Sequence, residues 1–168
     1  MKRTAGFTLV EILIVVVLLG ILAAVVLPAV SNGAIAARRA ALMQDLQLLR
    51  RVVLIYETQH LEVAPGYANG DTSAAPTEAV FVDQATLASR ESGQTAAPGT
   101  AGFNRGPYLL RIPTNPLNNL NTVQMLGDGE GFPAEGDDSH GWMYKAAAGE
   151  IRADSPGTDS EGLSYCEY

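Results

Sequence analysis

An almost uncharged apolar run from Phe7 to Val30 constrains this chain more than any other feature. The residues that interrupt its leucine, isoleucine, valine and alanine are Thr8, Glu11, Gly20 and Pro28. An α-helix rises about 1.5 Å per residue, so about 20 residues cross the hydrocarbon core of a bilayer. The run therefore predicts one membrane-spanning helix. Lys2 and Arg3 precede it, which predicts a cytoplasmic N-terminus and an external remainder.

Glu11 is a carboxylate inside this apolar run, and such a charge is costly and usually functional. The stretch Gly6-Phe7-Thr8-Leu9-Val10-Glu11, behind the leader of residues 1–6, resembles the class III signal of type IV pilins and type II secretion pseudopilins. The resemblance implies that a prepilin peptidase cleaves between Gly6 and Phe7 and that Phe7 becomes N-methylated. It also implies that Glu11 receives the amine of a neighbouring subunit during assembly, because an unpaired desolvated charge is heavily penalised.

Three other interpretations explain the apolar run less well. A plain membrane anchor gives Glu11 no purpose. A secretory signal cleaved near Ala34-Ile35-Ala36 would have an apolar region much longer than the usual 7–15 residues. A buried helix of a soluble protein would need more apolar chain around it than the remaining sequence supplies.

Gly20 and Pro28 fall where many members of the resembled family carry a helix-breaking pair. Within a helix, glycine costs about 1 kcal/mol and proline about 3 kcal/mol relative to alanine. In lipid the helix should persist, because unpaired amides are very costly there. The resemblance implies an assembly role in which this segment extends locally in the filament, and a simple proline kink is the alternative.

An amphipathic pattern follows the apolar run. Apolar residues at three- and four-residue intervals predict that residues 31–60 continue the same helix to about Gln59 or His60. Residues 61–105 are rich in Ala, Gly, Ser, Thr and Pro, and resemble the variable loop that follows the helix in this family. Within that loop the sequence suggests a brief strand over 80–82 and a helical turn over 86–88.

Residues 106–168 contain most of the strand-like sequence. Candidate strands are residues 108–112, 122–126, 142–145 and 150–152, and the last two flank Ala146-Ala147-Ala148-Gly149, a hairpin signal. Residues 106–116 and 141–152 resemble segments of G-type pseudopilins. The expected fold is α+β, pilin-like, with a small antiparallel sheet packed against the outer half of the long helix.

The head is acidic and carries one candidate metal site. Residues 61–168 hold 5 basic and 15 acidic residues, a balance of −10, which argues against nucleic acid as a partner. Calcium takes six to eight oxygen ligands, and the glycine-rich stretch 127–138 is dense in carboxylates. G-type pseudopilins have a calcium-binding loop in the head, and a solvated acidic loop is the alternative here. The candidate ligands are Asp128, Glu130, Asp137 and Asp138.

Nothing in the sequence predicts catalysis. It contains no phosphate-binding loop and no dinucleotide fingerprint. Ser139-His140 is better interpreted as a polar loop pair than as part of a triad. Cys166 is the single cysteine, so the head has no intramolecular disulfide.

Taken together, the resemblance implies a non-enzymatic subunit of a type II secretion pseudopilus. It would sit in the bacterial inner membrane as a single-pass protein with a periplasmic head. Its expected partners are prepilin peptidase, the inner-membrane assembly platform, other pseudopilins, and copies of itself in a filament that drives the export of periplasmic proteins. Two alternatives remain, a type IV major or minor pilin of a surface filament, and a single-span membrane-anchored binding domain.

Overall fold

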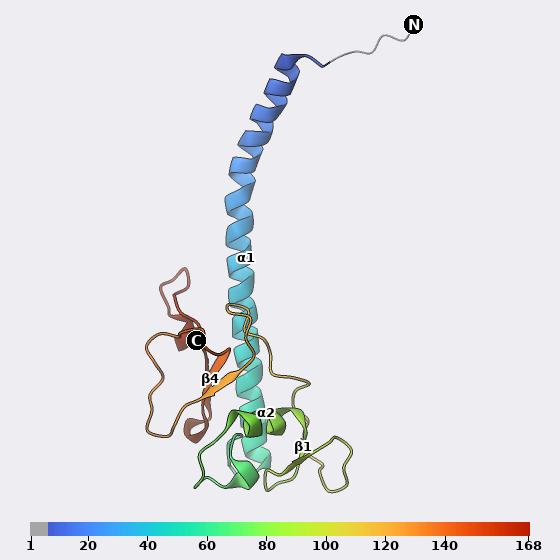
Figure 1. The fold of residues 1–168 in the computed structure, drawn as a ribbon, viewed down its shortest axis with the longest axis vertical. Helices are drawn as coiled ribbons and strands as arrows, with labels where there is room; N and C mark the ends of the chain where they lie inside the picture. Colours follow the sequence, from blue (N-terminus) through green and yellow to red (C-terminus); the bar gives the residue numbers. More distant parts are fainter. Residues whose placement is uncertain (1–6) are drawn as a thin grey trace. The chain divides into compact units, whose positions relative to one another are not determined.

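The computed structural model describes residues 7–168, except for the side chains of residues 25–32. The predicted leader, including Gly6, therefore lies outside the described residues. The chain divides into two compact units, residues 1–38 and 39–168. One helix, α1 (Leu9–Gln59), contributes residues to both units (Figure 1).

In the first unit the described side chains of α1 have no apolar partner. The large apolar residues between Leu9 and Leu22 are 47–83% exposed, and they occur on every side of the helix. A helix that is apolar all round normally belongs in an apolar environment. The backbone stays helical through Gly20 and Pro28, so neither residue ends the helix in this structure.

Among the described residues, no helix combines the length and apolarity needed to cross a membrane. The predicted span of residues 7–30 includes residues 25–30, whose side chains lie outside the description.

In the second unit α1 buries one face, as its amphipathic pattern predicts. The buried apolar residues follow helical spacing of three and four, and they are Leu42, Leu46, Leu49, Val52, Val53 and Tyr56. The helix ends at Gln59, which confirms the predicted boundary.

Two left-handed residues follow the end of α1. Leu61 has φ 58° and Glu62 has φ 63°, a conformation that costs an L-residue roughly 1–2 kcal/mol and that helices usually assign to glycine. The Glu62 amide donates to the Glu57 carbonyl at 3.0 Å, and the Val63 amide donates to the His60 carbonyl at 3.1 Å. These bonds close the helix end, but they leave the Leu61 side chain 70% exposed.

The predicted variable loop contains regular structure. After the 3-10 turn η1 (Ala68–Gly70) come the helix α2 (Glu78–Thr86) and the paired strands β1 (Ala88–Ser89) and β2 (Thr95–Ala96). The strand predicted at 80–82 is wrong, because the Thr77 hydroxyl accepts the Val80 amide at 3.4 Å and starts a helix there. The helical turn predicted at 86–88 is also wrong, since β1 begins at Ala88.

The second sheet has the order β3 (Val123–Met125), β4 (Trp142–Lys145), β5 (Glu150–Ala153). The predicted hairpin is confirmed, because β4 and β5 pair antiparallel, with Trp142 opposite Ala153 and Lys145 opposite Glu150. The turn between them is η2 (Ala146–Ala148), followed by Gly149 at φ 60°. A short 3-10 turn, η3 (Tyr165–Glu167), lies near the end of the chain.

Two details of the predicted sheet are wrong. It is mixed rather than antiparallel, because β3 runs parallel to β4 with Val123 opposite Trp142. Residues 108–112 are not a strand, because the amides of Tyr108 and Leu109 both donate to the Ala85 carbonyl at the end of α2 and hold this segment against that helix. Proline at 113 further limits strand pairing.

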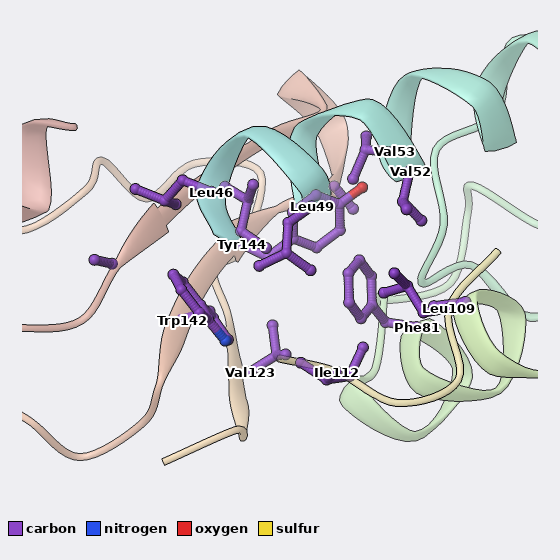
Figure 2. Close-up of a cluster of buried hydrophobic side chains, with 14 of the residues drawn as sticks. Leu46, Leu49, Val52, Val53, Phe81, Leu109, Ile112, Val123, Trp142 and Tyr144 are labelled. Carbon is purple, nitrogen blue, oxygen red and sulfur yellow. The ribbon is translucent and has the colours of Figure 1, made fainter. Parts of the chain in front are cut away.

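The core lies between α1, α2 and the second sheet, as Figure 2 shows. Phe81 of α2 packs against Tyr144 of β4 with ring centroids 4.7 Å apart. The side chains labelled in Figure 2 come from these elements and from the irregular segment 108–112: Leu46, Leu49, Val52, Val53, Phe81, Leu109, Ile112, Val123, Trp142 and Tyr144. The α+β, pilin-like class expected from the sequence is confirmed, with a smaller and more irregular sheet than expected.

Candidate processing and assembly site

The N-terminus of α1 is closed by a reciprocal pair of hydrogen bonds between Thr8 and Glu11. The Thr8 hydroxyl accepts the Glu11 amide at 3.2 Å, and one Glu11 carboxylate oxygen accepts the Thr8 amide at 2.9 Å. The Thr8 hydroxyl also donates to that oxygen at 2.9 Å. This arrangement is a capping box, in which two otherwise unpaired amides of the first turn are satisfied.

The capping box gives Glu11 a role that the sequence analysis missed. The signal was present as Thr-x-x-Glu directly before an apolar run, but Glu11 was interpreted solely as a partner for another subunit. The two roles are compatible, since an ionised carboxylate offers about four lone-pair sites. Phe7, the expected mature N-terminus, precedes the box and is 79% exposed.

The four candidate calcium ligands all lie in the loop that connects β3 to β4. Asp128 has a long contact, 3.5 Å, from the Tyr67 hydroxyl. The carboxylate of Glu130 accepts the Gly127 amide at 2.8 Å, and the carboxylate of Asp137 accepts the Ser139 amide at 2.9 Å. No group of three or more His, Cys, Asp or Glu side chains in the described part of the chain is placed to hold a metal ion. As this loop lies here, the four carboxylates do not form a calcium site by themselves.

Hydrogen-bond donors of the protein itself bind the backbone and the carboxylates of this acidic region. The Lys145 ammonium donates to the Glu130 carbonyl at 2.6 Å. Asp154 is 1% exposed, and its carboxylate accepts the amides of Asp137 and His140, each at 2.8 Å, and the Ser139 hydroxyl at 3.2 Å. A buried carboxylate needs such donors, because an unpaired one is strongly penalised.

Charged residues of α1 bind the C-terminal segment, residues 159–168, through ion pairs and hydrogen bonds. Arg39 forms an ion pair with Asp159 at 2.7 Å and a longer one with Glu161 at 3.6 Å. The Tyr168 hydroxyl donates to the same Asp159 carboxylate, and this bond contributes most to a pKa of Asp159 below its ordinary value of 3.8. Arg50 donates to the main-chain oxygens of Ile151, at 3.3 Å, and of Tyr168.

A small pocket opens between α1 and this C-terminal segment, with a volume of about 240 Å³. Two guanidinium groups, three apolar side chains and one tyrosine form most of its wall. The lining residues are Arg39, Met43, Leu46, Gln47, Arg50, Leu163 and Tyr168.

Comparison with known proteins finds a matching N-terminal motif and similarity over most of the chain. Residues 1–27 match the family model of the prokaryotic N-terminal methylation motif. The type II secretion system core protein G of Klebsiella pneumoniae is 28% identical over 154 residues, which cover 84% of this chain and 96% of that protein. The protein of the same name from Aeromonas hydrophila is 29% identical over 77% of each chain.

The Pseudomonas aeruginosa core protein G is 29% identical over 70% of this chain and 71% of its own length. No solved structure matches the chain. The similarity extends well beyond the apolar N-terminus into the head. The chain thus carries the prokaryotic N-terminal methylation motif and is similar over most of its length to type II secretion system core protein G.

Proposed function

We propose that this chain is a structural subunit of a type II secretion pseudopilus. A prepilin peptidase would remove residues 1–6 and methylate Phe7. Before assembly, the mature chain would span the inner membrane with its head in the periplasm. The assembly platform would then move it into a helical filament, together with copies of itself and other pseudopilins, and growth of that filament would drive periplasmic proteins outward.

The observation that best supports this proposal is the exposed apolar surface of α1 between Leu9 and Leu22. Burial of apolar surface stabilises by about 25 cal/mol per Å², so a helix that exposes it on all sides requires lipid or other helices around it. A filament supplies neighbouring helices, and a membrane supplies lipid before assembly. The charged Glu11 inside that surface then marks the point where each helix must find a partner of opposite charge.

Processing is tested by replacing Gly6 with alanine and measuring the intact mass of the purified protein. We expect the unaltered chain to lose residues 1–6 and to gain the mass of one methyl group. The Gly6→Ala protein should keep the mass of the uncleaved precursor. Gly33→Ala is the matched control, since a Cβ there meets no atom within 4 Å, and this variant should be processed normally. An unprocessed wild-type chain in a strain with an active prepilin peptidase would contradict the proposal.

The secretion role is separated from a surface pilus by deletion and fractionation. Loss of the chain should abolish export of periplasmic proteins to the medium, and the chain itself should remain with the cell envelope after shearing. Recovery of the chain in sheared surface filaments, with export intact in the deletion strain, would support a surface pilin instead.

A further inference from the structure

The end of α1 presents an apolar side chain beside a charge. Leu61 is 70% exposed and Glu62 is also exposed, so a leucine side chain and a carboxylate stand next to each other at the surface. Both residues have left-handed backbones, and non-glycine residues in that conformation gather at functional sites. We call this pair the Leu61–Glu62 knob.

The pocket between α1 and the C-terminal segment has the complementary chemistry. Met43, Leu46 and Leu163 give it apolar walls, while Arg39 and Arg50 place guanidinium groups in its lining. Arg39 already pairs with Asp159 and Glu161, and Arg50 donates to main-chain oxygens. Its volume of about 240 Å³ is below the roughly 300–1,000 Å³ of small-molecule sites, and it suits one or two side chains.

The knob of one copy does not reach the pocket of the same copy. Both features belong to the second unit: the pocket lies beside α1, and the knob follows the end of that helix. Gln47, in the pocket wall, is twelve residues before Gln59, where α1 ends, so about 18 Å of helix separates them. The knob lies beyond that end. If the knob enters such a pocket, the pocket therefore belongs to another copy of the chain.

We infer that the Leu61–Glu62 knob of one copy docks into the pocket formed by α1 and residues 163–168 of a second copy. The leucine is buried between Met43, Leu46 and Leu163, and the carboxylate lies beside the guanidinium groups. Since different surfaces of the two copies meet, the contact is head-to-tail, and a head-to-tail contact that does not close into a ring propagates as an open helix. This inference rests on the proposed filament and assigns one of its contacts.

Cysteine cross-linking in cells that express the full-length chain tests this contact. The double variant Leu61→Cys/Gln47→Cys places a thiol in the knob and another in the pocket wall, and a disulfide forms when the Cβ atoms approach to about 4 Å. We expect a ladder of dimers, trimers and longer species under oxidising conditions. Each single variant should give no ladder. Cys166 is buried, so the natural thiol is shielded from the reaction.

A second pair of thiols controls for chance collision. Leu110 is 98% exposed and belongs to neither the knob nor the pocket, so Leu110→Cys/Gln47→Cys should give no ladder. Filaments that sediment normally but give no Leu61–Gln47 ladder would overturn the docking contact and leave the proposed function intact. Failure of the wild-type chain to be processed or to form filaments would instead overturn the proposed function. Dimers from the Leu61→Cys single variant would also overturn the inference, because they indicate a two-fold contact.

Substitution of the knob separates docking from folding. In Leu61→Gly, the glycine adopts the positive φ of this position without strain, so the melting temperature of the purified chain should not fall. Filament yield should nevertheless fall about tenfold, as expected when one leucine is no longer buried. Leu110→Gly, the matched exposed control, should assemble normally. An unchanged filament yield for Leu61→Gly would overturn the inference.

Discussion

His60 is a buried base that connects the end of α1 to β1. One ring nitrogen, Nδ1, lies 2.7 Å from the Tyr56 carbonyl, and Nε2 lies 2.9 Å from the Ser89 hydroxyl. A carbonyl only accepts, so Nδ1 carries the proton and the Ser89 hydroxyl donates to Nε2. The ring also stacks on Tyr56, with centroids 3.7 Å apart. A neutral ring satisfies every one of these contacts.

We expect His60 to make the head less stable in mild acid. Burial lowers the pKa of His60 below its ordinary value of 6.5, with the nearby Arg105 acting in the same direction and Glu91 opposing it. The unfolded chain therefore binds a proton more readily than the folded one, so stability present above pH 6.5 declines as the pH falls below it. Urea unfolding midpoints measured between pH 7.5 and 5 should fall for the wild type.

The control for this prediction is His60→Asn, which removes the titrating group. It should be less stable at pH 7.5, and its midpoint should change less between pH 7.5 and 5. Equal pH slopes for the two proteins would show that other groups, such as the carboxylates of the head, account for the acid sensitivity.

At the scale of elements, the buried side-chain amide of Gln84 links α2 to the turns on either side of it. The Gln84 side chain accepts the Gly66 amide at 2.7 Å and donates to the carbonyls of Tyr67 at 2.9 Å and Gly93 at 3.0 Å. Gln84 is 1% exposed. It thus joins the turn after α1, the helix α2 and the β1–β2 connection in one network.

We predict that Gln84→Leu destabilises the head by about 3 kcal/mol, because three buried main-chain groups lose their partners and each such loss costs about 1–3 kcal/mol before relaxation. Chemical denaturation of the purified chain in detergent measures the change. Gln47→Leu is the matched control on the exposed face of α1 and should alter stability by less than about 0.5 kcal/mol. A similar loss of stability in both variants would show that the hydrogen bonds of Gln84 do not stabilise the head.

The elements that the sequence predicted correctly are those with local signals. The amphipathic spacing of Leu42, Leu46 and Leu49 gave α1, and the glycine at 149 marked the β4–β5 turn. Gly149 is required there because it adopts φ 60° and because a Cβ would lie 2.5 Å from a Glu57 carboxylate oxygen.

The elements that were predicted wrongly depend on contacts distant in the sequence. Residues 108–112 have the composition of a strand, but the Ala85 carbonyl takes two of their amides and leaves the segment irregular. The parallel pairing of β3 with β4 is equally non-local. At the candidate site, Arg39 forms an ion pair with Asp159, which lies 120 residues away in the sequence, so no local pattern could predict this contact.

At the scale of the whole molecule, Glu11 combines a cap and a charge, and two substitutions separate them. Glu11→Gln keeps a side chain that completes a capping box but removes the charge, whereas Glu11→Ala removes both. We expect both variants to be processed and both to reduce filament yield at least tenfold, measured by sedimentation. Val10→Ala, at a neighbouring exposed position, is the control. Normal assembly of Glu11→Gln would show that capping, and not charge, is required.

Calcium binding by the acidic loop remains a prediction that a chelator experiment decides. The carboxylates of Asp154, Glu130 and Asp137 are held by amides and hydroxyls of the protein itself. We therefore expect the melting temperature of the purified chain to be unchanged by EGTA or by added calcium. A fall of several degrees in EGTA, restored by calcium, would indicate that the loop rearranges to bind the ion.

The capping box at Thr8 and Glu11 has an electrostatic consequence for maturation. The N-terminal end of a helix carries a partial positive charge of about half an elementary charge, which extends over the first turn. Cleavage before Phe7 would create an ammonium group two residues ahead of Leu9, where α1 begins. Like charges would then meet at the end of the longest helix of the protein, and the Glu11 carboxylate would be the nearest group able to neutralise them. Maturation would thus leave each subunit with a positively charged helix end, which the Glu11 carboxylate of a neighbour can stabilise.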